Sequence, residues 1–99
     1  MELARVEGTV VSTAKVDRLL GYKLLLVNLV GPDTKPTSNY VVAVDTIGAG
    51  KGEIVIVVRG SSARQAKSLQ SVPTDTSIIA IVDSIELNGE IVFDKAKGS

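Results

Sequence analysis

The chain has 99 residues, and its 11 Lys and Arg side chains balance 11 Asp and Glu side chains, so the formal net charge is zero. A nucleic-acid binder normally carries a basic face that displaces counterions from phosphates, and this balance disfavours that class. Neither cysteine nor histidine occurs, which excludes disulfides, the usual zinc sites, thiol nucleophiles and imidazole acid–base chemistry.

Apolar and β-branched patterns predict a single all-β domain over residues 1–99. The expected strands, in chain order, are Ala4–Val11, Lys23–Val30, Tyr40–Thr46, Glu53–Arg59 and Ser77–Leu87. The expected connections are polar loops over Lys15–Gly21 and Gly31–Asn39 and one short helix over Ser62–Gln70.

The C-terminal part has its own pattern. The pair Asn88-Gly89 predicts a type I′ turn, because both residues tolerate the positive φ that this turn requires. The chain then returns through Glu90–Phe93 as the second strand of a hairpin. We expect the tail Lys95–Ser99 to be frayed.

Three of the predicted strands are apolar on both faces, at 24–27 continuing to 29–30, at 54–58 and at 78–82. An isolated small barrel has a wet outer face, so its strands should alternate between apolar and polar residues. Because an uncovered β-branched surface would favour aggregation, we expect self-association to cover the outer face.

The loop Gly48–Glu53 holds three glycines at alternate positions. A phosphate-binding loop is followed by a helix N-terminus, whereas here a predicted strand follows, so nucleotide binding is disfavoured. An ordinary β-turn is one explanation. We favour another, in which the glycines let copies of this loop crowd together at a subunit junction. The predicted junction or axis loop comprises Gly48, Ala49, Gly50, Lys51, Gly52 and Glu53.

Charged residues near the loops allow alternatives. Arg64 follows the small residues Gly60, Ser61, Ser62 and Ala63, and is either a solvated surface charge or pairs across a subunit interface with Asp45 or Asp83. Glu53 is either a solvated strand start or, with Lys51, part of a ring of charge near a symmetry axis. A catalytic carboxylate pair of Asp45 and Asp83 is disfavoured, since nothing around them suggests a substrate site.

Short motifs follow one another in order along nearly the whole chain. The main motifs are Val44-Asp45-Thr46, Gly48-Ala49-Gly50, Gly52-Glu53 and Gly60-Ser61-Ser62-Ala63-Arg64. Supporting motifs are Arg5-Val6, Gly8-Thr9-Val10-Val11, Leu20-Gly21, Lys23-Leu24-Leu25 and Ile81-Val82-Asp83. Together they resemble the EutN/CcmL family of pentameric vertex proteins of bacterial microcompartment shells. The segments Gly31–Asn39 and Ala66–Thr76 depart from the family pattern and leave the type of microcompartment open.

The resemblance implies a five-stranded, OB-like β-barrel in a ring of five that closes the vertices of a cytoplasmic shell tiled by hexameric proteins. It also implies no catalysis and no cofactor. Two other hypotheses remain: an OB-type module for single-stranded nucleic acid, which three aromatic residues at zero net charge argue against, and, more weakly, a carboxylate-based hydrolase. No signal peptide is expected, because Glu2 and Arg5 interrupt the N-terminus, and no membrane span is expected, because no apolar run approaches roughly 18 residues.

Overall fold

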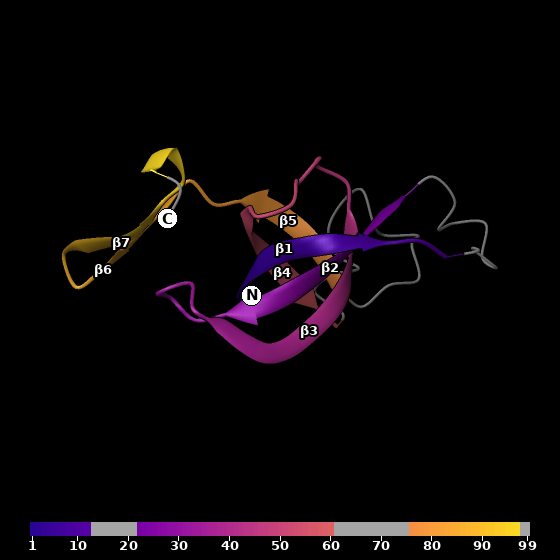
Figure 1. The fold of residues 1–99 in the computed structure, drawn as a ribbon, viewed down its shortest axis with the longest axis horizontal. Helices are drawn as coiled ribbons and strands as arrows, with labels where there is room; N and C mark the ends of the chain where they lie inside the picture. The colour runs from indigo at the N-terminus through magenta and orange to yellow at the C-terminus, as the bar shows by residue number, and fades with distance from the viewer. Residues whose placement is uncertain (13–21, 61–75, 98–99) are drawn as a thin grey trace.

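Five strands close into a barrel in the order β1-β2-β3-β5-β4, and two further strands form a separate hairpin. The computed structural model describes residues 1–12, 22–60 and 76–97. The strands are β1 Glu2–Val10, β2 Lys23–Val30, β3 Pro36–Asp45, β4 Ile54–Arg59, β5 Thr76–Ile81, β6 Ser84–Leu87 and β7 Glu90–Asp94, followed by the 3-10 helix η3 Lys95–Lys97. Figure 1 shows the barrel and, beyond one end of it, the hairpin β6–β7.

Neighbouring barrel strands are antiparallel except for β3 and β5, which pair in parallel. This order, with β5 inserted between β3 and β4, is that of an OB-like barrel. The interior is filled by small and β-branched side chains because a five-stranded barrel has a narrow lumen. The core residues include Ala4, Val6, Leu25, Val27, Ala43, Val55, Val57 and Ile78. The predicted all-β barrel with a C-terminal hairpin is confirmed.

Strand β3 begins at Pro36, four residues before the predicted start at Tyr40, so the boundary placed in the loop Gly31–Asn39 was wrong. The reason is the buried side chain of Asn28 on β2. Its Nδ2 donates to the carbonyl oxygens of Thr37 at 2.8 Å and of Asn39 at 3.1 Å, and its Oδ1 accepts the Thr37 N–H at 3.2 Å. These bonds hold a polar stretch beside β2 across an irregularity in the strand register.

The predicted fifth strand, Ser77–Leu87, is in fact two strands, because the chain leaves the barrel at Val82 and Asp83. The Val82 N–H still donates to the carbonyl oxygen of Ile54 at 2.8 Å before the chain turns away into β6. The turn between β6 and β7 is confirmed, since Asn88 has a φ of 54° and Gly89 a φ of 85°.

Part of the apolar outer surface is already covered within one chain. Ile54 and Val58 on β4 are buried, while Leu24 and Leu26 on β2 are half-buried. The chain itself therefore covers part of the outer face on which self-association is expected. An exposed apolar surface nevertheless remains at Tyr40 and Val42 on β3.

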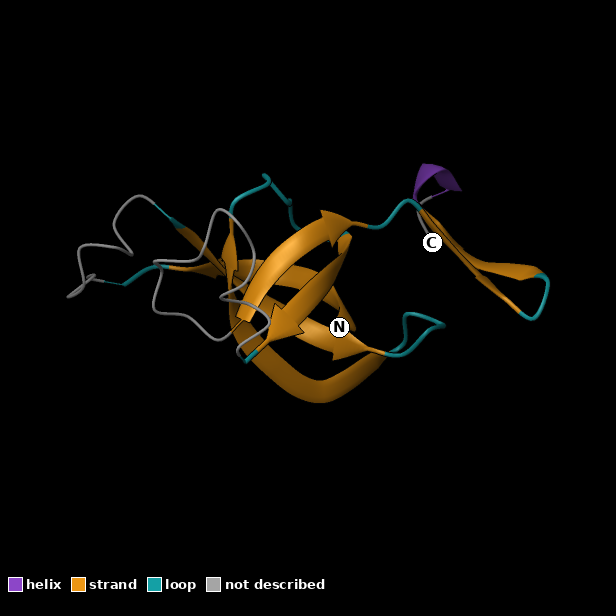
Figure 2. Cartoon of the chain, turned by 180° about the vertical axis from the view of Figure 1, so that it is seen from behind, coloured by secondary structure: helices purple, strands orange, loops and turns teal. Residues whose placement is uncertain are grey.

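The C-terminal tail is not frayed at its start, contrary to the prediction for Lys95–Ser99. Residues Lys95–Lys97 form a 3-10 turn, and Lys95 makes an ion pair with Glu53. The predicted helix over Ser62–Gln70 lies outside the described residues. Within the described residues, no helix is long and apolar enough to cross a membrane. Figure 2 shows from behind that the hairpin stands apart from the barrel strands.

Candidate functional site

The glycine loop that joins β3 to β4 is held to the first strand by backbone hydrogen bonds. The N–H of Gly52 donates to the carbonyl oxygen of Val6 at 2.8 Å. The N–H of Val6 donates to the carbonyl oxygen of Glu53 at 2.9 Å. Gly48 and Gly52 have φ values of 83° and 88°, which side-chain-bearing residues rarely adopt, whereas Gly50 has no positive φ. The loop is therefore an ordered structure, and only two of its three glycines are required by its backbone.

Asp45 closes the first half of this loop from the end of β3. Its two carboxylate oxygens accept the N–H groups of Ile47 at 3.1 Å and of Ala49 at 2.9 Å. Asp45 is only 5% exposed and Ala49 is fully buried. Because a buried N–H without a partner is costly, the carboxylate stabilises the start of the loop.

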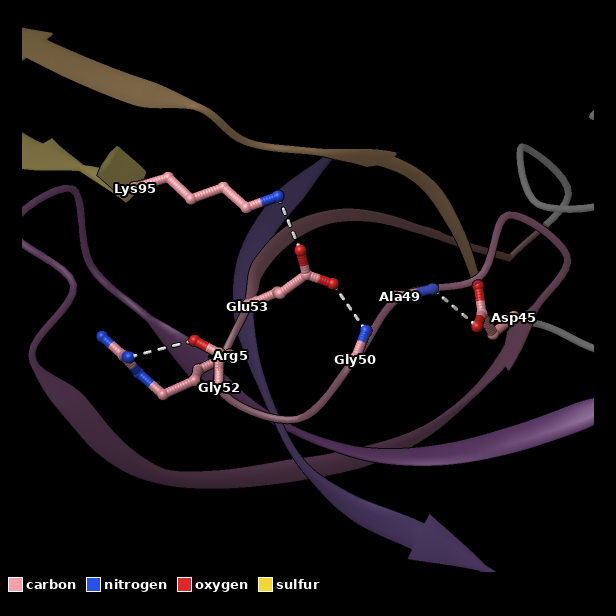
Figure 3. A network of polar contacts seen from close by, with 7 residues as sticks. All are labelled: Arg5, Asp45, Ala49, Gly50, Gly52, Glu53 and Lys95. Atoms are coloured by element: carbon pink, nitrogen blue, oxygen red, sulfur yellow. Dashed lines mark hydrogen bonds and ion pairs between the residues drawn. The ribbon is translucent and has the colours of Figure 1, made fainter. Parts of the chain in front are cut away.

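Glu53 closes the second half of the loop and links it to the C-terminal turn (Figure 3). One carboxylate oxygen accepts the Gly50 N–H at 2.6 Å, and the other lies 2.7 Å from Nζ of Lys95. The bond from Lys95, followed by the bond from Gly50, lowers the pKa of the Glu53 carboxyl below its ordinary value. The same bond with Glu53 raises the pKa of the Lys95 ammonium.

Two further cations contact carbonyl oxygens of the loop. A guanidinium nitrogen of Arg5 on β1 donates to the carbonyl of Gly52, and Nζ of Lys23 on β2 donates to that of Ala49, each at 3.3 Å. Lys51 is exposed at the loop tip. The loop thus exposes Gly48, Lys51 and Gly52 to the surroundings, while cations of its own barrel engage the carbonyls of Ala49 and Gly52.

The predicted site residues fall into three places. Gly48, Ala49, Gly50, Lys51, Gly52 and Glu53 lie together in the loop, with Asp45 at its base. Gly60 directly follows β4 with a φ of 69°, whereas Ser61, Ser62, Ala63 and Arg64 lie outside the described residues. Asp83 is exposed where the chain leaves the barrel, and its carbonyl oxygen accepts the Lys95 N–H at 2.8 Å.

The geometry favours a structural role for Asp45. Both of its oxygens are engaged by backbone N–H groups, so it is not arranged as a free acid or base. In the part of the chain that the structure describes, no group of three or more Asp or Glu residues could hold a metal ion. Sequence reasoning missed the contributions of Lys95 and Asn28, because an isolated lysine in a polar tail and an asparagine inside a strand give no local signal.

An OB-like barrel with an ordered, glycine-rich β3–β4 loop and a separate C-terminal hairpin defines a small structural module. Residues 1–83 match the family described as "Ethanolamine utilisation protein EutN/carboxysome". The chain is 43% identical over 95 residues, 96% of this chain and 100% of the relative, to the bacterial microcompartment shell vertex protein EutN of Escherichia coli K12. The chain therefore belongs to the EutN/CcmL family, as its motifs indicate.

Solved structures agree with this membership. The structure of CcmL from Gloeobacter violaceus superposes with a TM-score of 0.91 at 38% identity, covering 97% of this chain and 99% of that one. The GrpN pentameric microcompartment shell protein from Rhodospirillum rubrum superposes with a TM-score of 0.79 at 49% identity, covering 88% of this chain and 99% of that one. These relatives are structural shell proteins, which confirms the prediction that the chain is not an enzyme, and none of them supports the nucleic-acid-binding alternative.

Proposed function

We propose that this protein assembles into a homopentamer that closes the five-fold vertices of a bacterial microcompartment shell in the cytoplasm. The observation that carries the proposal is the shared barrel and 49% identity with a pentameric microcompartment shell protein. A heterologous interface repeated by a fixed rotation closes into a ring, and a ring of five provides the curvature that a flat hexagonal sheet lacks.

The neighbours of this pentamer in the shell are hexameric shell proteins of the same microcompartment. The charge balance of the chain suits such contacts, because a neutral subunit is not repelled by copies of itself or by neighbours of either sign. The same balance gives no reason to expect binding to nucleic acid.

Within the ring, the loop Gly48–Glu53 faces the axis, where five copies meet. Its glycines leave little side-chain volume, and its bonds to Val6 and Lys95 fix its shape before subunits meet. A surface that is already ordered loses less conformational entropy on association. Asp45, Gly60, Ser61, Ser62, Ala63, Arg64 and Asp83 are the residues we assign to contacts between subunits. Asp45 contributes indirectly, because it holds the loop that makes the contact.

Native mass spectrometry of the purified protein tests the assembly, with an expected mass of five times 10.4 kDa. A stable monomer would contradict the proposal. A hexamer would contradict the vertex assignment, because a vertex of this geometry requires five subunits. Co-expression with a hexameric shell protein from the same gene cluster tests the partner: closed particles are expected with this protein, and open sheets or tubes without it.

A further inference from the structure

The turn at the outer end of the hairpin β6–β7 carries the dipeptide Asn88-Gly89. Every residue from Glu86 to Glu90 is exposed, and the hairpin is a sheet of its own that stands apart from the barrel strands (Figures 1 and 2). An isolated two-stranded hairpin is at best marginally stable in water. We therefore expect this turn to open locally far more often than the barrel does.

The side-chain amide of Asn88 and the backbone nitrogen of Gly89 are the two groups that react when asparagine deamidates. The deprotonated nitrogen attacks the side-chain carbonyl carbon, and a new C–N bond closes a five-membered succinimide ring. The bond to the amide nitrogen breaks, and that nitrogen takes up a proton and leaves as ammonia. Water then adds to one of the two ring carbonyls, and the opened ring leaves either aspartate or iso-aspartate at position 88.

The local structure leaves the attacking nitrogen of Gly89 accessible. Gly89 has no side chain to obstruct ring closure, and a Cβ added there would meet nothing within 4 Å. Its N–H donates to Oε1 of Glu86 at 3.3 Å, which is longer than an ordinary N–H···O bond, so the turn is held only weakly.

The two other asparagines of the chain lack this combination. Asn28 is buried, and its Nδ2 donates to two backbone carbonyls of β3. Asn39 is exposed but lies within β3. The residues that follow them are Leu29 and Tyr40, whose side chains hinder attack by their own backbone nitrogens. Exposure, a weakly held turn and a following glycine thus coincide at Asn88 alone.

We propose that Asn88 is a site of spontaneous deamidation in the folded protein, through a succinimide formed with the nitrogen of Gly89. The reaction needs a single chain, so it does not depend on the proposed ring. Either product changes the formal net charge from zero to minus one. The new carboxylate lies near Glu86 and Glu90, and like charges on adjacent strands are unfavourable.

The iso-aspartate product changes the turn further, because its main chain runs through the former side-chain carbon. The added backbone atom does not fit a two-residue type I′ turn. The base of the hairpin is held separately, by the bond of the Val82 N–H to Ile54 and by the pair of Lys95 with Glu53. The change is therefore confined to the outer end of the hairpin.

Incubation of the purified protein in a mildly alkaline buffer tests the site. Intact-mass spectrometry should show the gain that replacement of NH₂ by OH gives, and peptide mapping should place it at Asn88. Enzymatic methylation of iso-aspartyl groups should label the same peptide, because a succinimide gives both products whereas direct hydrolysis gives aspartate alone. The rate should rise with pH, since the nitrogen attacks in its deprotonated form. Absence of iso-aspartate, or an equally fast gain at Asn39, would overturn the proposal.

Two matched variants assign the mass gain to one residue. Asn88→Asp has no side-chain amide at the turn and should slow the gain at least tenfold. Asn39→Asp makes the same change at the other exposed asparagine and should leave the rate within twofold of wild type. Equal rates in the two variants would overturn the assignment to Asn88, provided that circular dichroism shows both to be folded.

A sample unfolded in guanidinium chloride separates the effect of the fold from that of the dipeptide. Because the turn opens readily, Asn88 in the folded protein should react within about tenfold of its rate in the unfolded chain. A folded-state rate more than tenfold slower would show that the turn stays closed, and would overturn the proposal.

Discussion

Nζ of Lys95 lies 2.7 Å from the carboxylate of Glu53, so the residue that starts the C-terminal turn is bound to the end of the glycine loop. The same carboxylate accepts the Gly50 N–H, and one side chain therefore joins the loop, the barrel and the base of the hairpin. Lys95 is thus unsuitable as a neutral surface control in mutagenesis of this protein, although its place in a polar tail would suggest that use.

Glu53→Ala should lower the melting temperature more than Glu53→Gln. The glutamine keeps an oxygen that can accept the Gly50 N–H and loses only the charge, whereas alanine removes both bonds. Differential scanning calorimetry at one fixed protein concentration measures the difference, because the melting of an oligomer depends on concentration. Equal melting of the two variants would show that the Gly50 bond contributes nothing.

The Glu53–Lys95 pair should make stability depend on pH at both ends of the range. The Glu53 pKa is lowered in the folded state, so its contribution is present above its ordinary value of 4.5 and is lost as the pH falls through the folded-state pKa. The Lys95 pKa is raised, so its contribution is present below 10.5 and is lost as the pH rises through the folded-state pKa. The difference in melting temperature between wild type and Glu53→Gln should therefore disappear in acid.

Asp45→Ala should destabilise the folded chain by about 1–3 kcal/mol, because it leaves the buried N–H of Ala49 and the partly buried N–H of Ile47 without this acceptor. Asp45→Asn retains one acceptor oxygen and should cost less. Urea denaturation followed by circular dichroism measures both. A neutral alanine variant would mean that the loop finds other acceptors.

Gly50 and Gly52 should respond differently to substitution by alanine. Gly52→Ala should cost about 1–2 kcal/mol, since its φ of 88° disfavours any side chain. Gly50→Ala should leave melting unchanged, because its φ is not positive and the new Cβ would lie 3.4 Å from the Glu53 carboxylate, an ordinary contact.

The larger change Gly50→Val then tests crowding of the loops at the axis. A substitution at Gly52 would also strain the backbone, because its φ is 88°, and so would not separate the two effects. Five valines around the axis should weaken the pentamer while the barrel spectrum stays unchanged. A full pentamer in this variant would indicate that the loop is an ordinary turn.

Arg64→Ala should shift the protein toward smaller species at micromolar concentration. A desolvated ion pair broken from one side costs about 3–5 kcal/mol, and the ring has one such interface per subunit. Lys35→Ala is the matched control, because Lys35 is an exposed cation whose 3.8 Å contact with Asp33 is weak. Analytical ultracentrifugation of both variants makes the comparison, and equal behaviour would identify Arg64 as a solvated charge.

Strands and turns could be predicted from the sequence where a local pattern, such as apolar alternation or an Asn-Gly pair, determines the structure. Alternation placed Ala4 and Val6 correctly on the inner face of β1, and the Asn88-Gly89 pair located the hairpin turn. Alternation failed after Val6, where an irregularity in the pairing with β2 shifts the register, so Gly8 and Val10 do not continue the buried face. Such a bulge changes which side chains face inward without changing the composition of the strand.

The parts that could not be predicted depend on contacts between distant segments. The early start of β3 depends on the Asn28 side chain, and the position of the turn Lys95–Lys97 depends on Glu53, which is far from Lys95 in the chain. The loop glycines were recognised as special, but only the backbone angles separate Gly48 and Gly52 from Gly50. Sequence patterns report on residues that are close along the chain, whereas these contacts and backbone angles depend on residues that are close only in the folded structure.

The position of β5 between β3 and β4 has a consequence for biosynthesis. The barrel closes only when Thr76–Ile81 pairs with both neighbours, so a nascent chain that ends before this segment has an open edge on each of two strands. Since β1 also pairs with β4, closure joins segments far apart in the chain, a topology that folds slowly. A subunit can therefore present a closed barrel only after Thr76–Ile81 has left the ribosome and paired with β3 and β4.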